Sequence, residues 1–356
     1  MSTLKYGVAF GTLIFGISAC APKVDEQSSS GKYLYAVSGG CYVGSATASS
    51  AAKTIVRYNL STGNIDRTII DYNAIAGDTP VAAINSDDSN ILVLVENTAG
   101  RRVDSVNKLT GVRTTLTTLV GTTTVARDLV ALKNGGYLVP RSAAMEKYNS
   151  AFARVFSNAA NPWMNGPGGT CATSTTTVSR AVELANGKVI FSHGTASQNR
   201  FGILPATMAT QADCLQGQAS PIIASAFPTA MTYIPDAGGA GIGHLLVAYA
   251  SATGATVASN LIGQYAITES SNVITPSAAT NAAAFADTSI INGPSAMVYD
   301  SDSGYLYVAN GSTNLANTIE KFTYNASTKL LTRVGTSSFA PETINSRCIN
   351  SMFLAN

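Results

Sequence analysis

The sequence predicts an all-β fold built from repeated four-stranded units. Short runs of Val, Ile, Leu, Tyr and Thr alternate with turns rich in Gly, Asn, Asp and Ser along most of the chain, and helical periodicity is almost absent. A pattern of strand, loop, strand, turn and strand also recurs six times, with a period of about 42 to 65 residues. Four-stranded units at this period are typical of the blades of a β-propeller.

The six copies are clearest at their central strands. One copy reads Tyr305-Leu-Tyr-Val-Ala-Asn-Gly, and the others begin near Lys32, Asn90, Gly136, Lys188 and His244. From the second copy onward, a short apolar strand and a polar turn come first. These first strands start at Val81, Leu129, Ala181, Ala230 and Ala296. Only the first copy lacks such a strand.

The end of the chain supplies the missing strand. Cys348 to Leu354 has the pattern of a first strand but no copy of its own. If this strand completes the N-terminal blade, the ring closes and leaves no open sheet edge. We therefore expect one propeller domain over residues 32–356, with six blades, or seven if the poorly patterned stretch Thr207–Pro228 contains another.

The repeat resembles that of the YVTN and lactonase-like family. The resemblance is carried mainly by Leu306-Tyr-Val-Ala-Asn and the following Ile319-Glu-Lys-Phe. It covers most of the chain at the level of the repeat and implies a propeller fold. It brings no catalytic residue with it, because repeat motifs specify fold rather than chemistry.

The N-terminus has the pattern of an export signal. Lys5 precedes an apolar run from Tyr6 to Ile17, which is short for a membrane span. Ile17-Ser-Ala-Cys20 resembles the bacterial lipobox, which implies removal of residues 1–19 and lipidation of Cys20. The alternative is an ordinary signal peptide with an incidental cysteine.

Residues 20–31 are polar and without periodicity, which predicts a flexible tether. Ala21 follows Cys20 where an aspartate would resemble an inner-membrane retention signal, so we expect an exported protein anchored in the outer membrane. The net charge is +2, or +1 without Lys5, and only 12% of residues are charged. This composition argues against a nucleic-acid partner and against membrane contact other than through the lipid.

The predicted strand directions define two faces of the ring. Loops after second and fourth strands gather on one face, here called the loop face, and the expected long loops are Ser38–Ala52, Ser157–Thr177, Ser251–Asn260, Pro276–Pro294 and Thr336–Arg347. The opposite face, here called the turn face, carries tight turns such as Leu60–Asn64 and Lys108–Gly111. Ligands of propellers usually bind on the loop face.

Four cysteines follow Cys20, and an even number in an exported chain predicts disulfides. Cys41 and Cys348 belong to the same composite blade, so a bridge between them would lock the ring. Three pairings of the four cysteines are possible; in the one favoured, Cys171 and Cys214, which flank the fourth blade, form the other pair. A reactive or metal-binding role is the alternative, but no CxxC or Cys/His spacing supports it.

Charged residues near the starts of the innermost strands are candidates for ligand binding. Arg127, Arg180 and Arg347 are expected to line the channel mouth, where their forked donors could hold a carboxylate, a phosphate or an acidic sugar. In the structural alternative, Asp128 and neighbouring backbone carbonyls neutralise these arginines and link the blades.

Two further loop-face residues are candidates. Trp163, the single tryptophan, lies in a Gly- and Pro-rich loop and would suit stacking on a sugar or peptide, or would pack as a structural cover. His193 is a possible general base without a supporting triad. We predict no metal site or cofactor, and interpret the acidic turns at Asp87 and Asp300 as ordinary polar turns rather than calcium loops.

Three functions remain open. The favoured hypothesis is a non-enzymatic envelope module that binds a protein, peptide or glycan on the loop face. The second is a lactonase-like hydrolase or a lyase, and the third is a scaffold within an envelope assembly.

Overall fold

The computed structural model describes residues 31–43, 46–119, 127–141, 144–155, 177–195, 198–205, 226–236, 242–251, 261–268, 273–276, 290–291, 293–311, 318–325, 327–328, 330–340 and 348–356. Within these ranges the protein is all-β, with one short 3-10 helix, η1 (Tyr72–Ala74), as predicted for the class. No helix in the described part of the chain is long and apolar enough to cross a membrane.

The described strands form six antiparallel sheets, and four of them have four strands. Sheet 1 contains β22 (Ile349–Ala355), β1 (Tyr33–Val43), β2 (Ala46–Asn59) and β3 (Ile65–Asp71). Sheet 2 contains β4 (Thr79–Asn85), β5 (Asn90–Asn97), β6 (Gly100–Asn107) and β7 (Arg113–Leu119). The last strand of the chain thus pairs with β1, from Tyr33 opposite Ala355 to Ser38 opposite Ile349.

The remaining sheets follow in chain order. Sheet 3 contains β8 (Val130–Ala131), β9 (Tyr137–Arg141) and β10 (Ala144–Tyr148), and sheet 4 contains β11 (Thr177–Glu183), β12 (Val189–Thr195) and β13 (Gln198–Leu204). Sheet 5 contains β14 (Ala226–Pro235), β15 (Ile242–Ser251), β16 (Leu261–Thr268) and β17 (Val273–Pro276). Sheet 6 contains β18 (Pro294–Asp300), β19 (Tyr305–Asn310), β20 (Ile319–Asn325) and β21 (Leu330–Arg333).

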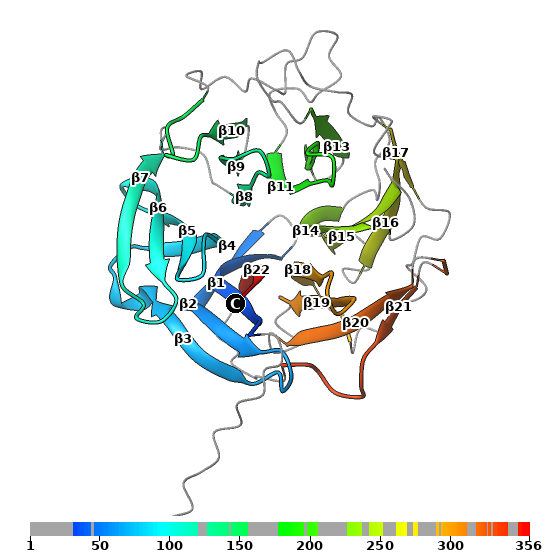
Figure 1. The fold of residues 1–356 in the computed structure, drawn as a ribbon, viewed down its shortest axis with the longest axis horizontal. Coiled ribbons are helices and arrows are strands. Elements are labelled where there is room, and N and C mark those ends of the chain that lie inside the picture. The colour runs from blue at the N-terminus through cyan, green and yellow to red at the C-terminus, as the bar shows by residue number, and fades with distance from the viewer. Residues whose placement is uncertain are drawn as a thin grey trace, which may run out of the picture.

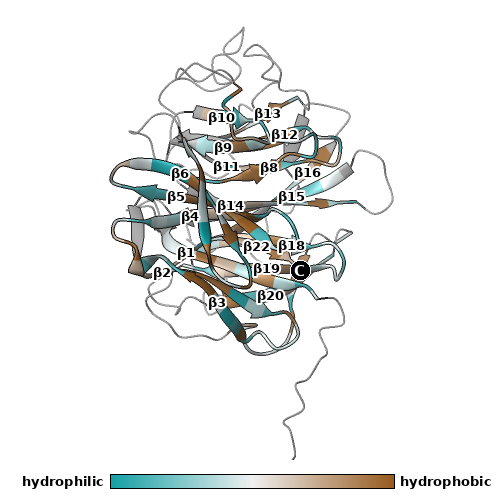
Figure 2. Ribbon diagram, turned by 60° about the vertical axis from the view of Figure 1, so that its left-hand side comes forward, coloured by the Kyte–Doolittle hydropathy of each residue, from teal (hydrophilic) through white to brown (hydrophobic). Residues whose placement is uncertain are grey.

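The six sheets are arranged around a common centre, with β22, β4, β8, β11, β14 and β18 innermost (Figure 1). Hydrophobic residues concentrate in the strands and hydrophilic ones in the turns (Figure 2). Six clusters of buried hydrophobic side chains each join two neighbouring sheets, and one of them joins sheet 6 to sheet 1. Burial between neighbouring sheets, rather than one central core, therefore holds the fold together.

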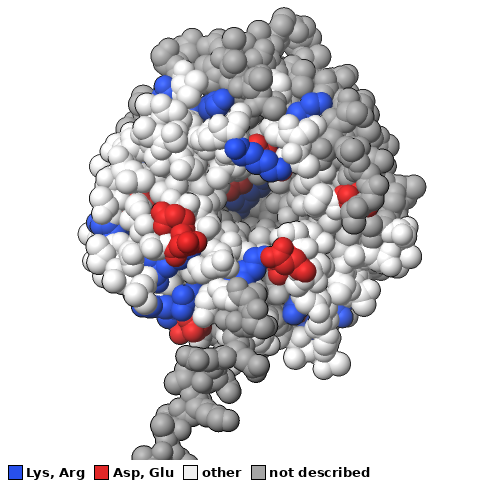
Figure 3. Space-filling view, in the orientation of Figure 1, with Lys and Arg blue, Asp and Glu red and all other residues white. Residues whose placement is uncertain are grey.

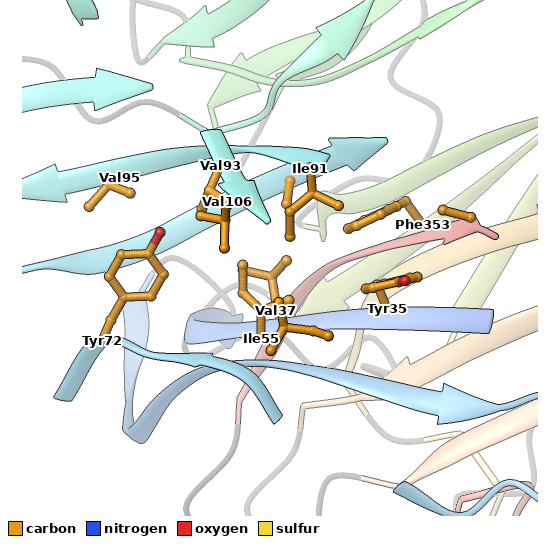
Figure 4. Close-up of a cluster of buried hydrophobic side chains, with 12 residues drawn as sticks. Tyr35, Val37, Ile55, Tyr72, Ile91, Val93, Val95, Val106 and Phe353 are labelled. Atoms are coloured by element: carbon orange, nitrogen blue, oxygen red, sulfur yellow. The ribbon is translucent and has the colours of Figure 1, made fainter. Parts of the chain in front are cut away.

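The cluster between sheets 1 and 2 shows how the strand pattern produces this packing (Figure 4). Every second residue of a strand points to the same face of its sheet. Val93 of β5 and Val37 of β1 belong to the cluster between the two sheets and are fully buried. Tyr35 of β1 stacks on Phe353 of β22, with ring centroids 4.8 Å apart. The predicted C-terminal strand therefore contributes an aromatic side chain to the core as well as backbone pairs.

An asparagine organises the turn after the third strand in several sheets. In sheet 1, Asn59 Oδ1 accepts hydrogen bonds from the backbone N–H groups of Ser61 and Thr62, and Gly63 takes a φ of +72°. The turn of sheet 2 repeats this with Asn107 as the acceptor. These are the tight turns that the sequence predicts at Leu60–Asn64 and Lys108–Gly111.

Ion pairs between the third strand and the segment that follows it, which is the fourth strand in sheets 1, 2 and 6, are a second repeated feature that the sequence analysis missed. Asp104 pairs with Arg113, Glu146 with Arg154 and Glu320 with Arg333, and the three acids are almost completely buried. Sheet 1 has the reversed pair, Arg57 with Asp66.

Two boundaries differ from prediction. The expected loop Ser38–Ala52 is largely a long hairpin, because β1 continues to Val43 and β2 starts at Ala46. Its Gly, Ser and Ala content suggested a loop, but it lacks proline, so the backbone keeps the donors that a ladder needs. The fourth strand expected of the third repeat is, among the described residues, only an isolated bridge between Tyr148 and Arg154.

Candidate functional site

The innermost strands share a β-bulge near their beginnings. One residue is skipped in the ladders of β4, β11, β14, β18 and β22, and the skipped residues are Val81, Ser179, Thr229, Ser295 and Asn350. In the third sheet the equivalent position is that of Arg127. It lies four residues before Ala131, the last paired residue of β8, just as Ser179 lies four residues before Glu183, the last paired residue of β11. A bulge bends the strand and turns backbone groups out of the ladder, here around the centre of the molecule.

Arg180, next to the bulge of β11, crosses this centre. Its Nε donates to the carbonyl of Thr229 at 2.5 Å, and its two terminal nitrogens donate to the carbonyls of Arg127 and Asn350, both at 2.8 Å. These carbonyls belong to sheet 5, to the segment before sheet 3 and to sheet 1. The planar five-donor fork of arginine suits such divergent acceptors, so one side chain links three sheets to its own.

Two other bulge residues make links of the same kind. The Thr229 hydroxyl lies 2.5 Å from the carbonyl oxygen of Pro294, at the start of β18, and 3.1 Å from that of Ala248. The Asn350 amide donates to the carbonyl of Val81 in β4. Polar bulge residues therefore connect sheet 5 to sheet 6 and sheet 1 to sheet 2 around the channel.

Asp128 lies beside Arg180 and is held by backbone amides. Its Oδ1 accepts from Leu129 N at 3.0 Å, its Oδ2 accepts from Ala181 N at 3.4 Å, and Arg180 is 3.8 Å away. Burial raises the pKa of Asp128, although the Arg180 charge and these hydrogen bonds act in the opposite direction. Burial also lowers the pKa of Arg127 to about 10, and the charge of Arg180 adds to this effect.

A cavity of about 220 Å³ occupies the channel on the turn-face side of the bulges. That face carries the connections between first and second strands, at residues 86–89, 132–136, 184–188 and 301–304. Figure 3 shows it hollowed at the centre, with acidic and basic atoms inside the hollow. The polar side chains that line the cavity are those of Asp128, Arg180, Thr232, Asn350 and Ser351, and the apolar lining includes Met231, Met297, Met352 and Phe353.

The structure brings only some of the predicted site residues together. Three of them meet at the channel, namely Arg127, Asp128 and Arg180. Arg180 contacts a backbone carbonyl and the Asp128 carboxylate, which is the arrangement that the structural alternative describes. Arg347 and Trp163 lie outside the described residues, and their ligand-binding roles stay predictions. His193 is a residue of β12 rather than of the loop after it, and its side chain is likewise outside the description.

The predicted disulfides are partly visible. Cys348, just before β22, is disulfide-bonded. Cys41 lies in the neighbouring β1, with its side chain outside the described residues, as are Cys171 and Cys214 altogether. The pairing scheme therefore stays a prediction.

The acidic turns serve local roles. Asp87 Oδ1 accepts from the backbone N–H groups of Ser89 and Asn90, both at 2.8 Å. Asp300 and Asp302 both accept from the Lys32 ammonium group. Among the described residues, no group of three or more His, Cys, Asp or Glu is placed to hold a metal ion.

The bulge residues are the part of the site that the sequence analysis missed, although a signal was present. Three innermost strands contain a polar residue, a small residue and a methionine in succession, at 229–231, 295–297 and 350–352. The polar residue forms the bulge and the methionine lines the cavity. A comparison of the six first strands with one another would have revealed it.

The sheets and their radial arrangement define a β-propeller, and solved structures support this class. A chain of the nidogen–laminin complex is similar over 92% of this chain and 99% of its own, with 10% identity and a TM-score of 0.54. A Lactobacillus plantarum protein (8% identity, 91% and 99% covered, TM-score 0.54) and a periplasmic gluconolactonase of Pseudomonas aeruginosa (10%, 91% and 99%, 0.51) are similar too. At these identities the likeness concerns the fold alone.

No protein-family model matches the chain, and no curated protein matches it.

Proposed function

We propose that this chain is an exported, lipid-anchored propeller of six blades that binds a protein, peptide or glycan through its loop face. The Cys20 pattern supports the anchor in the outer membrane. The six sheets, the pairing of β22 with β1 and the packing of sheet 6 against sheet 1 support a closed ring. In this proposal the sheets correspond to the six blades.

The observation that carries the proposal is the occupation of the channel by Arg180. All three nitrogens of its guanidinium donate to backbone carbonyls, two in other sheets and one in the segment before sheet 3, so the side chain is committed to the fold. The remaining cavity of about 220 Å³ is smaller than the roughly 300–1,000 Å³ of typical ligand pockets. A peptide or glycan would therefore have to be held by the loops around the channel rather than inside it.

Crosslinking and pull-down from cell envelopes test this proposal. We expect Trp163→Ala and Arg347→Ala to reduce recovery of the partner by about tenfold, as loss of an interface anchor does. Asp88→Ala, an exposed change on the turn face, is the matched control and should leave recovery unchanged. Equal recovery with all three variants would refute binding through the loop face.

Closure of the ring by a Cys41–Cys348 disulfide is part of the proposal. Cys348 precedes β22 by one residue, and β22 pairs with the strand that contains Cys41. Cys171 and Cys214 form the second proposed bridge. Mass spectrometry of unreduced peptides should recover exactly one Cys41–Cys348 species, and recovery of Cys348 linked to Cys171 or Cys214 would contradict the scheme.

One observation favours a second candidate, a lactone hydrolase. Asp128 combines a raised pKa with a position on the cavity wall, and such groups are candidates for general acid–base catalysis. One similar fold is named a gluconolactonase. If the candidate holds, the protein hydrolyses gluconolactone faster than buffer does, and Asp128→Asn lowers kcat/KM about 100-fold or more. A rate equal to that of buffer would exclude this candidate.

A further inference from the structure

The chain enters the ring at the turn face. Lys32 directly precedes β1, and its ammonium donates to Asp300 Oδ1 at 2.5 Å and to Asp302 Oδ2 at 2.7 Å. Both acids lie at the turn between β18 and β19, and the Asp300 side chain is only 4% exposed. Although burial opposes it, these two carboxylates raise the pKa of Lys32, so the ammonium is charged at neutral pH. The ion pairs fix the root of the N-terminal segment on sheet 6 at this face.

The segment between the proposed anchor and this root is short. Lys32 follows Cys20 by 12 residues, and a chain of this length spans at most about 40 Å whatever its conformation. The root-mean-square distance for a flexible chain of this length is about 19 Å. The turn face therefore stays close to the surface in which the lipid is embedded.

The loop face is much harder to bring to the same surface. The eight residues of β5 run between the two faces, which corresponds to a thickness of about 25 Å. Two more strands, β2 and β3, lie outside β1 in sheet 1 and add about 10 Å to a path around the edge. This path of about 35 Å, before side chains are included, leaves almost no slack in a fully extended segment.

From this geometry we propose that the lipid anchor holds the turn face toward the bilayer and presents the loop face to the aqueous side. The inference rests on the proposed lipidation of Cys20. In this orientation the loop face can bind a macromolecule that approaches from the aqueous compartment. It does not contact the bilayer that holds the anchor. The same orientation places the cavity opening on the side that faces the membrane.

Energy transfer to a lipid-surface acceptor tests this orientation. The lipidated protein is reconstituted in vesicles that contain a headgroup-labelled acceptor lipid, with a donor dye coupled to p-azidophenylalanine. Asp88→p-azidophenylalanine places the dye in the turn between β4 and β5, and Ala99→p-azidophenylalanine places it in the turn between β5 and β6, so the two sites lie on opposite faces of one sheet. Both positions are exposed.

We expect transfer from position 88 to exceed transfer from position 99 by at least about twofold, because the sites differ by about the thickness of the ring. Insertion of 12 Gly and Ser residues after Ser30 raises the maximal reach to about 80 Å and should reduce the difference. Equal transfer from the two positions, or greater transfer from position 99, would overturn the orientation while leaving the anchor intact. If the wild-type protein fails to sediment with vesicles, like a Cys20→Ser control, the anchor itself is refuted and the orientation with it.

Discussion

Several charged residues in the described part of this protein are buried in networks rather than exposed for contact. Asp78, in the connection before β4, shows the effect most clearly, since its side chain is only 3% exposed. It accepts hydrogen bonds from Arg102, Arg113 and Asn97. Asp104 shares both arginines. Such a group is costly to disturb, because removing one partner leaves the other charges buried and less well compensated.

Asp78 should make the free energy of unfolding depend on pH in the acidic range. Burial raises its pKa, but the hydrogen bonds from Arg102 and Asn97 and the arginine charges outweigh this, so the net pKa is lowered. Because the folded-state pKa lies below the unfolded one, the stabilisation is present above the unfolded pKa and is lost as pH falls through the folded pKa.

We expect Asp78→Asn to lower the free energy of unfolding at pH 7 by about 3 kcal/mol and to make the loss of stability below about pH 4 shallower. Urea unfolding at a series of pH values measures both effects. Parallel stability–pH curves for the variant and the wild type would show that Asp78 is not the source of the acid dependence.

At the scale of the strand, the third and fourth strands of several sheets are joined by ion pairs of different burial. Glu320 and Arg333 form a pair whose acid is almost completely buried: Arg333 Nε and one terminal nitrogen lie 3.0 and 2.7 Å from Glu320 Oε2. The Arg57–Asp66 pair of sheet 1 is more exposed, with Asp66 at 32%. Desolvation and alignment, rather than the number of pairs, decide how much each stabilises its strand.

A double-mutant cycle can separate these cases. We expect a coupling energy of about 1–3 kcal/mol between Glu320→Gln and Arg333→Met, as for contacting residues in a buried network. The matched cycle with Asp66→Asn and Arg57→Met should give less than about 1 kcal/mol. Equal coupling in the two cycles would mean that burial does not control the strength of these pairs.

The strands themselves could be predicted because they depend on local signals. Alternating apolar residues and Asn- or Gly-containing turns gave the sheets and the position of the C-terminal strand. The hairpin over Ser38–Ala52 was not predicted because its Gly, Ser and Ala residues can pair in a sheet but have no strong preference for strands. The partners of Arg180 were not assignable to particular residues, because they lie 49, 53 and 170 positions away in the sequence. Only the assembled ring brings these carbonyls together.

At the scale of the whole molecule, the first and the last of the described strands meet in sheet 1. β22 pairs with β1, and Phe353 completes the core between sheets 1 and 2. A disulfide at Cys348 joins this strand covalently to another part of the chain. If the partner is Cys41, as proposed, the cross-link closes a loop that spans nearly the whole domain and restricts the unfolded chain strongly.

We expect Cys348→Ala to lower the free energy of unfolding by about 2–4 kcal/mol. Cys41→Ala should produce the same loss, and the double variant should lose no more than either single variant. Thermal unfolding with and without reductant provides the measurement. Additive losses in the double variant would show that Cys41 and Cys348 are not partners.

Arg180 links sheets across the centre of the molecule, so its substitution should destabilise the whole ring. Arg180→Met keeps an unbranched apolar stem but removes the donors to three backbone carbonyls, and a buried carbonyl costs about 1–3 kcal/mol when left unpaired. Arg67→Met, on the fourth strand of sheet 1 and partly exposed, is the control and should change stability by less than about 0.5 kcal/mol. Denaturant unfolding should show a loss of at least about 3 kcal/mol for Arg180→Met, whereas a loss no larger than that of Arg67→Met would show that Arg180 does not hold the sheets together.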